Sequence, residues 1–207
     1  GQKPLILENV MPGTKNGDVV VFQQAVKNNT ANASSDTTQS TNSTTGSQTY
    51  AGGVGIAKNL FVGGVFGAKN NVLPSSGNLT LTTAMSGATL LFDAVAVAYT
   101  LPAVGADDVG VYFDFMTTVA STSAQSVTAA AGDLMTGGIN LIDDTAAYTA
   151  PQNVIKKPAT TFLICSMNGT TTGGKIGTKI RFTAISATAW FVEGVAFGSG
   201  VLATPFS

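Results

Sequence analysis

Residues 109–115, VGVYFDF, carry the alternation that decides the fold class of this chain. Val109, Val111, Phe113 and Phe115 occupy every second position, which places them on one face of an extended strand. The intervening Gly, Tyr and Asp lie on the opposite face. An apolar face opposite a mixed one is typical of a strand buried on one side only. The stretch therefore predicts a sheet that packs one face against a core.

The same period of two recurs along the C-terminal two-thirds of the chain. Further strand candidates are residues 78–83, 89–101, 125–130, 137–142, 160–167, 178–184 and 190–197. Clusters of Gly, Pro, Asn, Asp and Ser separate them. No window keeps a helical period, and residues 129–135 predict at most one helical turn. Roughly seven to nine short strands separated by turns predict a β-sandwich, jelly-roll-like, over residues 75–207.

The composition indicates a surface that associates with other chains. Of 207 residues, 10% are charged and 44% are hydrophobic, and the net charge is −1. An ordinary soluble protein has about 25% charged residues. Because charge repulsion helps to keep soluble proteins apart, a chain with so little charge has little to oppose association. We expect much of its surface to be buried against neighbours.

Two classes of partner are not expected. The ten Lys and Arg residues are scattered along the chain, whereas phosphate neutralisation requires a basic stripe. No apolar run reaches the roughly 18–20 residues that a membrane span needs, and residues 1–13 lack the apolar core of a signal peptide. The sequence therefore predicts neither nucleic acid nor a membrane as a partner.

The N-terminal part divides into segments of different composition. Residues 1–27 contain two apolar clusters separated by Pro-Gly and Asn-Gly turn signals, and they predict two short attachment strands. Residues 28–49 contain no aliphatic side chain larger than alanine, so they cannot bury enough apolar area to order themselves and predict an extended polar linker. Residues 50–74 predict a short β-stem, which precedes the head domain.

The glycine content of residues 45–67 is similar to that of a phosphate-binding loop. The dinucleotide fingerprint requires a third glycine where Lys58 stands, a preceding buried strand and a following helix. The stretch has none of the three. Residues 173–179, GGKIGTK, likewise lack the spacing of a P-loop. Nucleotide binding is therefore not predicted.

The same stretch fits a stem of intertwined strands. Val54 and Ile56 are two positions apart, as are Leu60 and Val62, with a turn between the two pairs. Gly55 interrupts the first strand, and a glycine inside a strand often marks the close approach of another backbone. Three copies of one backbone approach in this way around a threefold axis. We expect these five residues to make the contacts of a trimeric stem.

The residues needed for common catalytic and metal sites are scarce. The chain has no histidine and one cysteine, which removes the usual triad base and most zinc sites. The pairs Asp107–Asp108 and Asp143–Asp144 lie in predicted turns, where Asp commonly bonds to the backbone. Adjacent carboxylates on a strand also point to opposite faces. We expect no catalytic residue, no cofactor and no metal site.

A few remaining side chains need an assignment. Cys165 is predicted to be a small buried hydrophobe, and a single cysteine excludes an intrachain disulfide. Trp190 is predicted to fill the core. Tyr99, Tyr112 and Tyr148 fit either the core or a sugar-stacking surface that binds a host surface glycan, and the sequence leaves both alternatives open.

Residues 45–64, TGSQTYAGGVGIAKNLFVGG, resemble segments of the form T-G-…-GG-x-G-I-x-x-N-L-x-V-GG in phage fibre and other virion structural proteins. In that family the segments are trimeric β-structure placed before globular heads. Residues 99–115 and 190–198 are similar to parts of the β-sandwich heads of phage capsid decoration proteins and head fibres. The resemblance implies a homotrimer on the capsid surface of a virion, bound to the major capsid protein.

Three functions remain as expectations. The first is a non-enzymatic, all-β decoration or cement protein, or a short head fibre, of a bacteriophage capsid. The second is a receptor-binding tail fibre or tail-tip protein with the same architecture. The third is a carboxylate-dependent polysaccharide depolymerase. No individual residue is assigned to capsid attachment.

Overall fold

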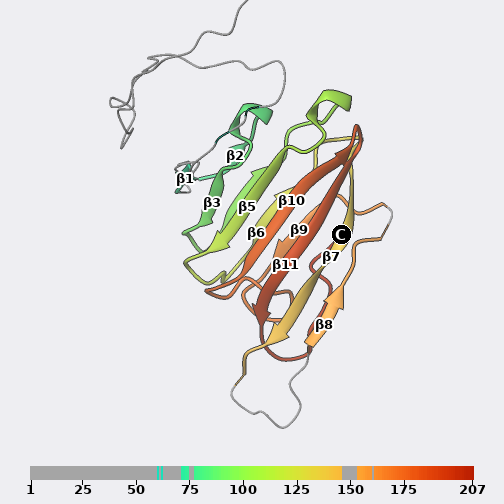
Figure 1. Ribbon diagram of the computed structural model, residues 1–207. Helices are drawn as coiled ribbons and strands as arrows, with labels where there is room; N and C mark the ends of the chain where they lie inside the picture. The colour runs from blue at the N-terminus through green and yellow to red at the C-terminus, as the bar shows by residue number, and fades with distance from the viewer. Residues whose placement is uncertain (1–59, 61, 63–70, 75–76, 146–152, 160) are drawn as a thin grey trace, which may run out of the picture. The chain divides into compact units, whose positions relative to one another are not determined.

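The computed structural model of the chain describes residues 60, 62, 71–74, 77–145, 153–159 and 161–207. The chain divides into two units, Gly1–Gly64 and Val65–Ser207. The described residues of the second unit form eleven strands and two short 3₁₀ helices (Figure 1). This preponderance of strands confirms the prediction of an all-β chain for the part described.

The strands are β1 Val72–Leu73, β2 Leu79–Thr80, β3 Thr89–Phe92, β4 Val97–Thr100, β5 Tyr112–Thr117, β6 Gln125–Thr128, β7 Leu134–Asp143, β8 Asn153–Lys156, β9 Ile164–Met167, β10 Lys179–Ser186 and β11 Ala189–Gly198. The helices are η1 Thr83–Met85 and η2 Ala106–Asp108.

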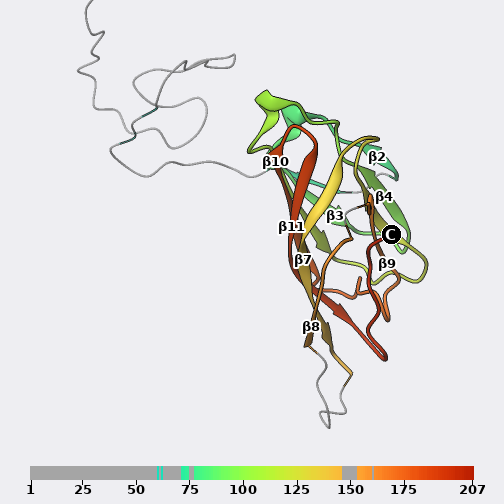
Figure 2. The same ribbon diagram turned by 90° about the vertical axis from the view of Figure 1, so that its right-hand side faces the viewer.

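The strands form two sheets that lie one against the other (Figure 2). A seven-stranded sheet has the order β1-β3-β5-β10-β11-β7-β8, and a four-stranded sheet has the order β2-β4-β6-β9. From β1 to β6 the chain alternates between the sheets. Each return to a sheet therefore passes through a strand of the other sheet, and β1, β3 and β5 run parallel, as do β2, β4 and β6. This mixed pairing differs from the antiparallel pairing of a jelly roll.

The strand limits differ from the predictions in several places. Residues 89–101 form two strands, β3 and β4, which belong to different sheets. Val109, predicted to share a face with Phe113, precedes β5 and is 54% exposed, because η2 and Gly110 (φ 97°) turn the chain there. Strands β1 and β8 were not predicted. Residues 129–135 contain no helix and lead directly into β7.

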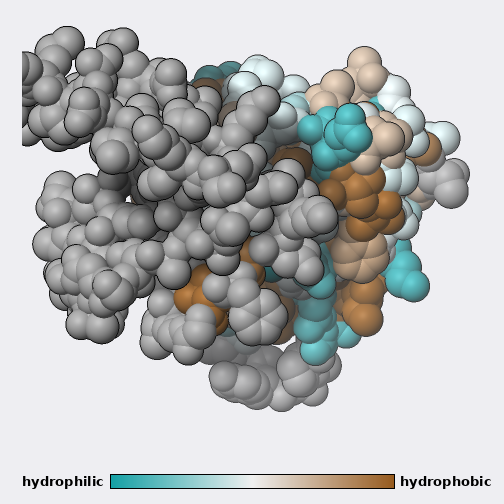
Figure 3. Space-filling view, turned by 45° about the horizontal axis from the view of Figure 1, so that its top comes forward, coloured by the Kyte–Doolittle hydropathy of each residue, from teal (hydrophilic) through white to brown (hydrophobic). Residues whose placement is uncertain are grey.

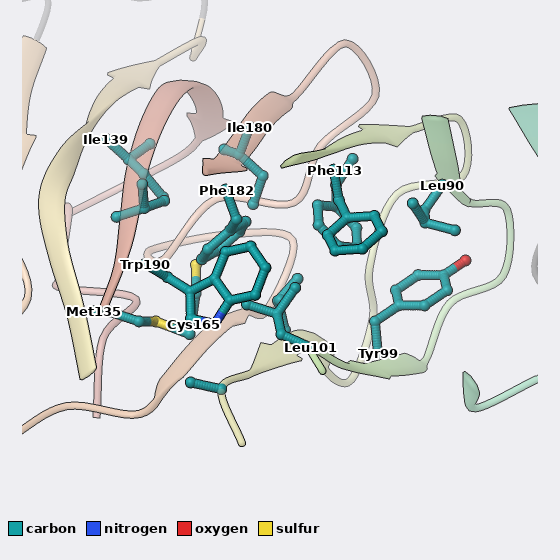
Figure 4. Close-up of a cluster of buried hydrophobic side chains, with 14 of the residues drawn as sticks. Leu90, Tyr99, Leu101, Phe113, Met135, Ile139, Cys165, Ile180, Phe182 and Trp190 are labelled. Carbon is teal, nitrogen blue, oxygen red and sulfur yellow. The ribbon is translucent and has the colours of Figure 1, made fainter. Parts of the chain in front are cut away.

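The two sheets share one hydrophobic core, in which aromatic rings connect the layers. The ring of Tyr99, from the four-stranded sheet, lies 5.3 Å from Phe92 and 5.3 Å from Phe115 of the facing sheet. Phe115 in turn lies 5.6 Å from Phe182. Trp190 is fully buried, as predicted, with its ring 5.9 Å from Phe113 (Figure 4).

Cys165 on β9 is also enclosed in this core, which confirms that it is a buried hydrophobe. Burial raises the pKa of its thiol from 9.0 to about 12. The C-terminal residues cover the outer edge of β9, where Cys165 forms an isolated bridge with Phe206. Ile164 and Ser207 exchange two backbone hydrogen bonds of 3.0 Å beside it.

We expect the Cys165 thiol to react with Ellman's reagent at pH 8 only when the protein unfolds, because reaction requires an accessible thiolate. One thiol should react rapidly in guanidinium and over hours in native buffer. Because the folded pKa is the higher one, the unfolded chain loses its proton first, and stability should fall as pH rises from 9.0 to about 12. Rapid reaction of the native protein would show that Cys165 is accessible.

Candidate functional site

The seven-stranded sheet has a face turned away from the core, which we call the outer face. Strand register aligns the outward side chains of β5, β10 and β11 in rows across the sheet. The rows are Tyr112–Thr183–Phe191, Asp114–Arg181–Glu193 and Met116–Lys179–Val195. The residues between them, such as Phe113, Phe182 and Val192, are buried. The period of two along each strand therefore fixes which side chains lie on the outer face.

An ion pair occupies the centre of the outer face. Arg181 Nε donates to Asp114 Oδ1 at 2.8 Å, and Arg181 Nη2 donates to Asp114 Oδ2 at 2.6 Å. The Asp114 side chain is only 8% exposed, whereas that of Arg181 is 41% exposed. The hydrogen bond to Asp114 raises the pKa of Arg181. This bidentate pairing neutralises a carboxylate that burial alone would disfavour.

The guanidinium of Arg181 has a second contact. Its central carbon lies 4.6 Å from the centre of the Tyr112 ring, a distance at which a cation is attracted to the face of an aromatic ring. The ring and the carboxylate hold the guanidinium in one orientation. Arg181 is therefore a fixed feature of the outer face.

A shallow depression of about 380 Å³ adjoins this ion pair. Its charged residues are two acids and two bases, so it has no net charge. Position 194 in the depression requires glycine. Gly194 has φ 143°, and an added Cβ would lie 2.3 Å from the carbonyl oxygen of Lys179. The lining residues are Asp114, Lys179, Arg181, Glu193, Gly194 and Val195.

Large apolar side chains surround the charged centre. They are Val72, Met116, Leu134, Ile155 and Phe191, exposed by 52, 39, 41, 65 and 37% respectively. Hydrophobic and hydrophilic residues lie side by side on the surface visible in Figure 3. Exposed apolar side chains that gather on one face commonly mark an interaction site, and Met116 and Phe191 lie in the rows on either side of the central charged row.

The outward face of the four-stranded sheet differs in kind. Its residues are mostly small or hydroxyl-bearing: Thr80, Ala98, Thr100, Ser126, Thr128 and Ser166. The larger Ile164 is half-buried beside the C-terminal Ser207. This face has the character expected of a surface in contact with water.

The predicted stem contacts lie mostly outside the part of the chain that the structure describes. Val54, Gly55 and Ile56 are outside the described residues. Leu60 and Val62 are described, and they are 58% and 44% exposed. The trimeric stem stays a prediction.

In each carboxylate pair, one Asp bonds to nearby backbone as predicted, although Asp143 is the last residue of β7 and does not lie in a turn. Asp108 Oδ2 accepts a hydrogen bond of 2.9 Å from the Gly105 amide. Asp143 Oδ1 accepts hydrogen bonds from the hydroxyl and the amide of Thr145, and these lower the pKa of Asp143. Asp144 pairs with Lys175. Within the described ranges, no group of three or more Cys, Asp or Glu residues is placed to hold a metal ion.

Of the three tyrosines for which both alternatives were open, the structure assigns Tyr99 to the core. Tyr99 is fully buried, and its hydroxyl donates to the Leu91 carbonyl oxygen at 2.6 Å. Tyr112 lies on the outer face beneath Arg181. Tyr148 is outside the described residues. Of the three, Tyr112 is placed where it can contribute to a binding surface.

No model of a known protein family matches the chain, and no curated protein matches it significantly. In the described part of the chain, no helix is long and apolar enough to cross a membrane. The described residues define an all-β fold in which the outer face of the seven-stranded sheet carries both charged and exposed apolar side chains.

Proposed function

We propose that this chain is a structural protein of a bacteriophage virion, which decorates or stabilises the capsid surface as a homotrimer. It is a decoration or cement protein or a short head fibre, with no enzymatic role. In this proposal residues 1–27 attach to the major capsid protein, residues 28–49 form an extended linker and residues 50–74 form the trimeric stem. Residues 75–207 form a β-sandwich head.

The observation that carries this proposal is the difference between the two sheet faces. A chain that works alone in water has no use for five large apolar side chains on an open face, whereas a component of an assembly covers them. The low content of charged residues, 10%, favours the same conclusion. The resemblance of residues 45–64 to phage fibre segments favours a phage virion as the assembly.

One observation favours the alternative of a receptor-binding tail fibre or tail-tip protein. The depression beside Arg181 offers carboxylates, an ammonium and a guanidinium, which are groups that can hydrogen-bond to the hydroxyls of a host surface glycan. The length of residues 28–74, by contrast, favours a position on the capsid over one in a tail fibre. A strand extends about 3.3 Å per residue, so residues 28–74 build a short stalk and not a long fibre shaft.

The capsid proposal predicts a copy number comparable with that of the major capsid protein in purified virions, measured by quantitative gel electrophoresis. Deleting residues 1–27 should abolish binding to particles that lack the protein, while the head stays folded and soluble. A copy number of only a few per virion would favour the tail alternative. Release of reducing ends from host polysaccharide would favour the depolymerase.

A further inference from the structure

The outer face carries an inference that deepens the proposed function and rests on the homotrimer within it. We infer that copies of this chain contact one another through the outer face of the seven-stranded sheet. Met116, Phe191 and the Asp114–Arg181 ion pair lie inside that contact. The argument uses the apolar content of the face, its charge pattern and its shape.

The apolar content shows that the face has a partner. Both sheets belong to one unit and share one core, so the burial of that core does not explain why their outward faces differ in composition. The four-stranded sheet presents small and hydroxyl-bearing residues. The seven-stranded sheet presents Met116 and Phe191 on either side of the central charged row, and Ile155 on its edge strand β8. Covering these side chains removes apolar area from water.

The charge pattern indicates that the partner is a second copy. Across the central row, Asp114, Arg181 and Glu193 alternate negative, positive and negative, and Lys179 adds a positive charge in the next row. A surface that carries both signs in balance can place its acidic groups against the basic groups of a second copy. A strongly acidic or strongly basic partner, by contrast, would bring like charges together. The net charge of −1 per chain adds little repulsion between copies.

The ion pair is suited to burial in such a contact. Asp114 is already neutralised by two hydrogen bonds from Arg181, so covering it leaves no unpaired buried charge. Tyr112 and Asp114 fix the guanidinium before association, which reduces the entropy lost when copies meet. Glu193 and Lys179 stay exposed at the depression and can pair with groups on the neighbouring copy.

The outer face carries two different patches that can meet in a contact between copies. In a cyclic trimer, two different patches of the chain meet at every contact. The depression over β10 and β11 is one patch. The projecting Ile155, 65% exposed on the edge strand β8, belongs to a second patch on the same face. One copy can therefore place its β8 edge against the depression of the next.

The test compares the full-length protein with Phe191→Lys on the outer face. Ser126→Lys, on the outward face of the four-stranded sheet, is the matched control. Native mass spectrometry should give three chains for the wild type and for Ser126→Lys. Phe191→Lys should associate at least about tenfold more weakly, because the new charge is buried in the contact. Trp190 fluorescence verifies folding, and Ile155→Lys replaces Phe191→Lys if that variant does not fold.

Met116 reports on the contact without being altered. It lies on β5, two strands from Phe191, and its oxidation by dilute hydrogen peroxide should be slow in the wild type and fast in the Phe191→Lys variant. If the wild type is a trimer that neither Phe191→Lys nor Ile155→Lys weakens, and Met116 is freely oxidised, the inference is wrong and the homotrimer still holds. A monomeric wild type would overturn the homotrimer itself. A monomer with protected Met116 would mean that another part of the same chain covers the face.

Discussion

Replacing Phe115 by alanine is expected to lower the free energy of unfolding by about 3–5 kcal/mol, the upper range for truncating a buried aromatic ring. Phe115 is fully buried on β5, and its ring contacts both sheets. It packs against Phe92 at 5.8 Å and Phe182 at 5.6 Å in its own sheet, and against Tyr99 at 5.3 Å in the facing one.

The expected loss of stability is large because the surrounding rings cannot fill the cavity that Phe115→Ala leaves. Three aromatic neighbours, each held by its own strand, relax only partly, so a cavity adds to the lost transfer free energy. Typical domains are stable by about 5–15 kcal/mol, so the loss is a large share of the total.

Urea denaturation followed by Trp190 fluorescence measures this effect. Val109→Ala is the matched control, because Val109 is 54% exposed just before the same strand, and it should change stability by no more than about 0.5 kcal/mol. A loss below about 1 kcal/mol for Phe115→Ala would mean that the sheets do not share the core described here.

Replacing Gly137 by alanine is expected to have the next largest effect. Gly137 lies within the long strand β7 at φ 95°, where a side chain costs of order 1–3 kcal/mol by backbone conformation alone. An added Cβ would also lie 2.3 Å from the carbonyl oxygen of Val192 on the neighbouring β11. Because that atom belongs to the backbone, the two strands must move apart, and the parallel ladder between them is disturbed.

Gly110→Ala separates the two contributions. Gly110 has nearly the same φ, 97°, but nothing lies within 4 Å of an added Cβ. Gly110→Ala should therefore show the conformational cost alone, and Gly137→Ala should unfold at clearly lower urea concentration. Equal midpoints for the two variants would indicate that β7 and β11 do not approach as closely as this ladder requires.

Local sequence was sufficient to identify the strands of the core and much of what they bury. The alternation at residues 109–115 and 178–184 placed Phe113, Phe115 and Phe182 inside, and all three are buried. This succeeds because a strand points successive side chains to opposite faces whatever its neighbours are. The local bonding of Asp108 and Asp143 was likewise predictable, since Asp accepts hydrogen bonds from amides close by in the chain.

Strand pairing was beyond the reach of local patterns. Residues 89–101 are mostly apolar and were predicted as one strand, yet the chain turns after Asp93 and the two halves, β3 and β4, belong to different sheets. A short apolar run does not show which of two sheets receives each half, because both halves are equally suited to burial. The edge strand β8 was not predicted, because it ends at Lys156 beside a second lysine, and adjacent lysines are typical of a solvated turn.

The outer face separates most clearly what the sequence determined from what only the tertiary structure decided. The sequence determined that Tyr112 and Asp114 lie opposite the core side chains of one strand, and Lys179 and Arg181 opposite those of another. Only the tertiary structure brought Arg181 onto Asp114, 67 residues away along the chain, and assembled the apolar residues around them. The reason is register, since a shift of one residue between β5 and β10 would turn these side chains to the opposite face. That register is set by packing across the shared core, to which strands from the whole head contribute.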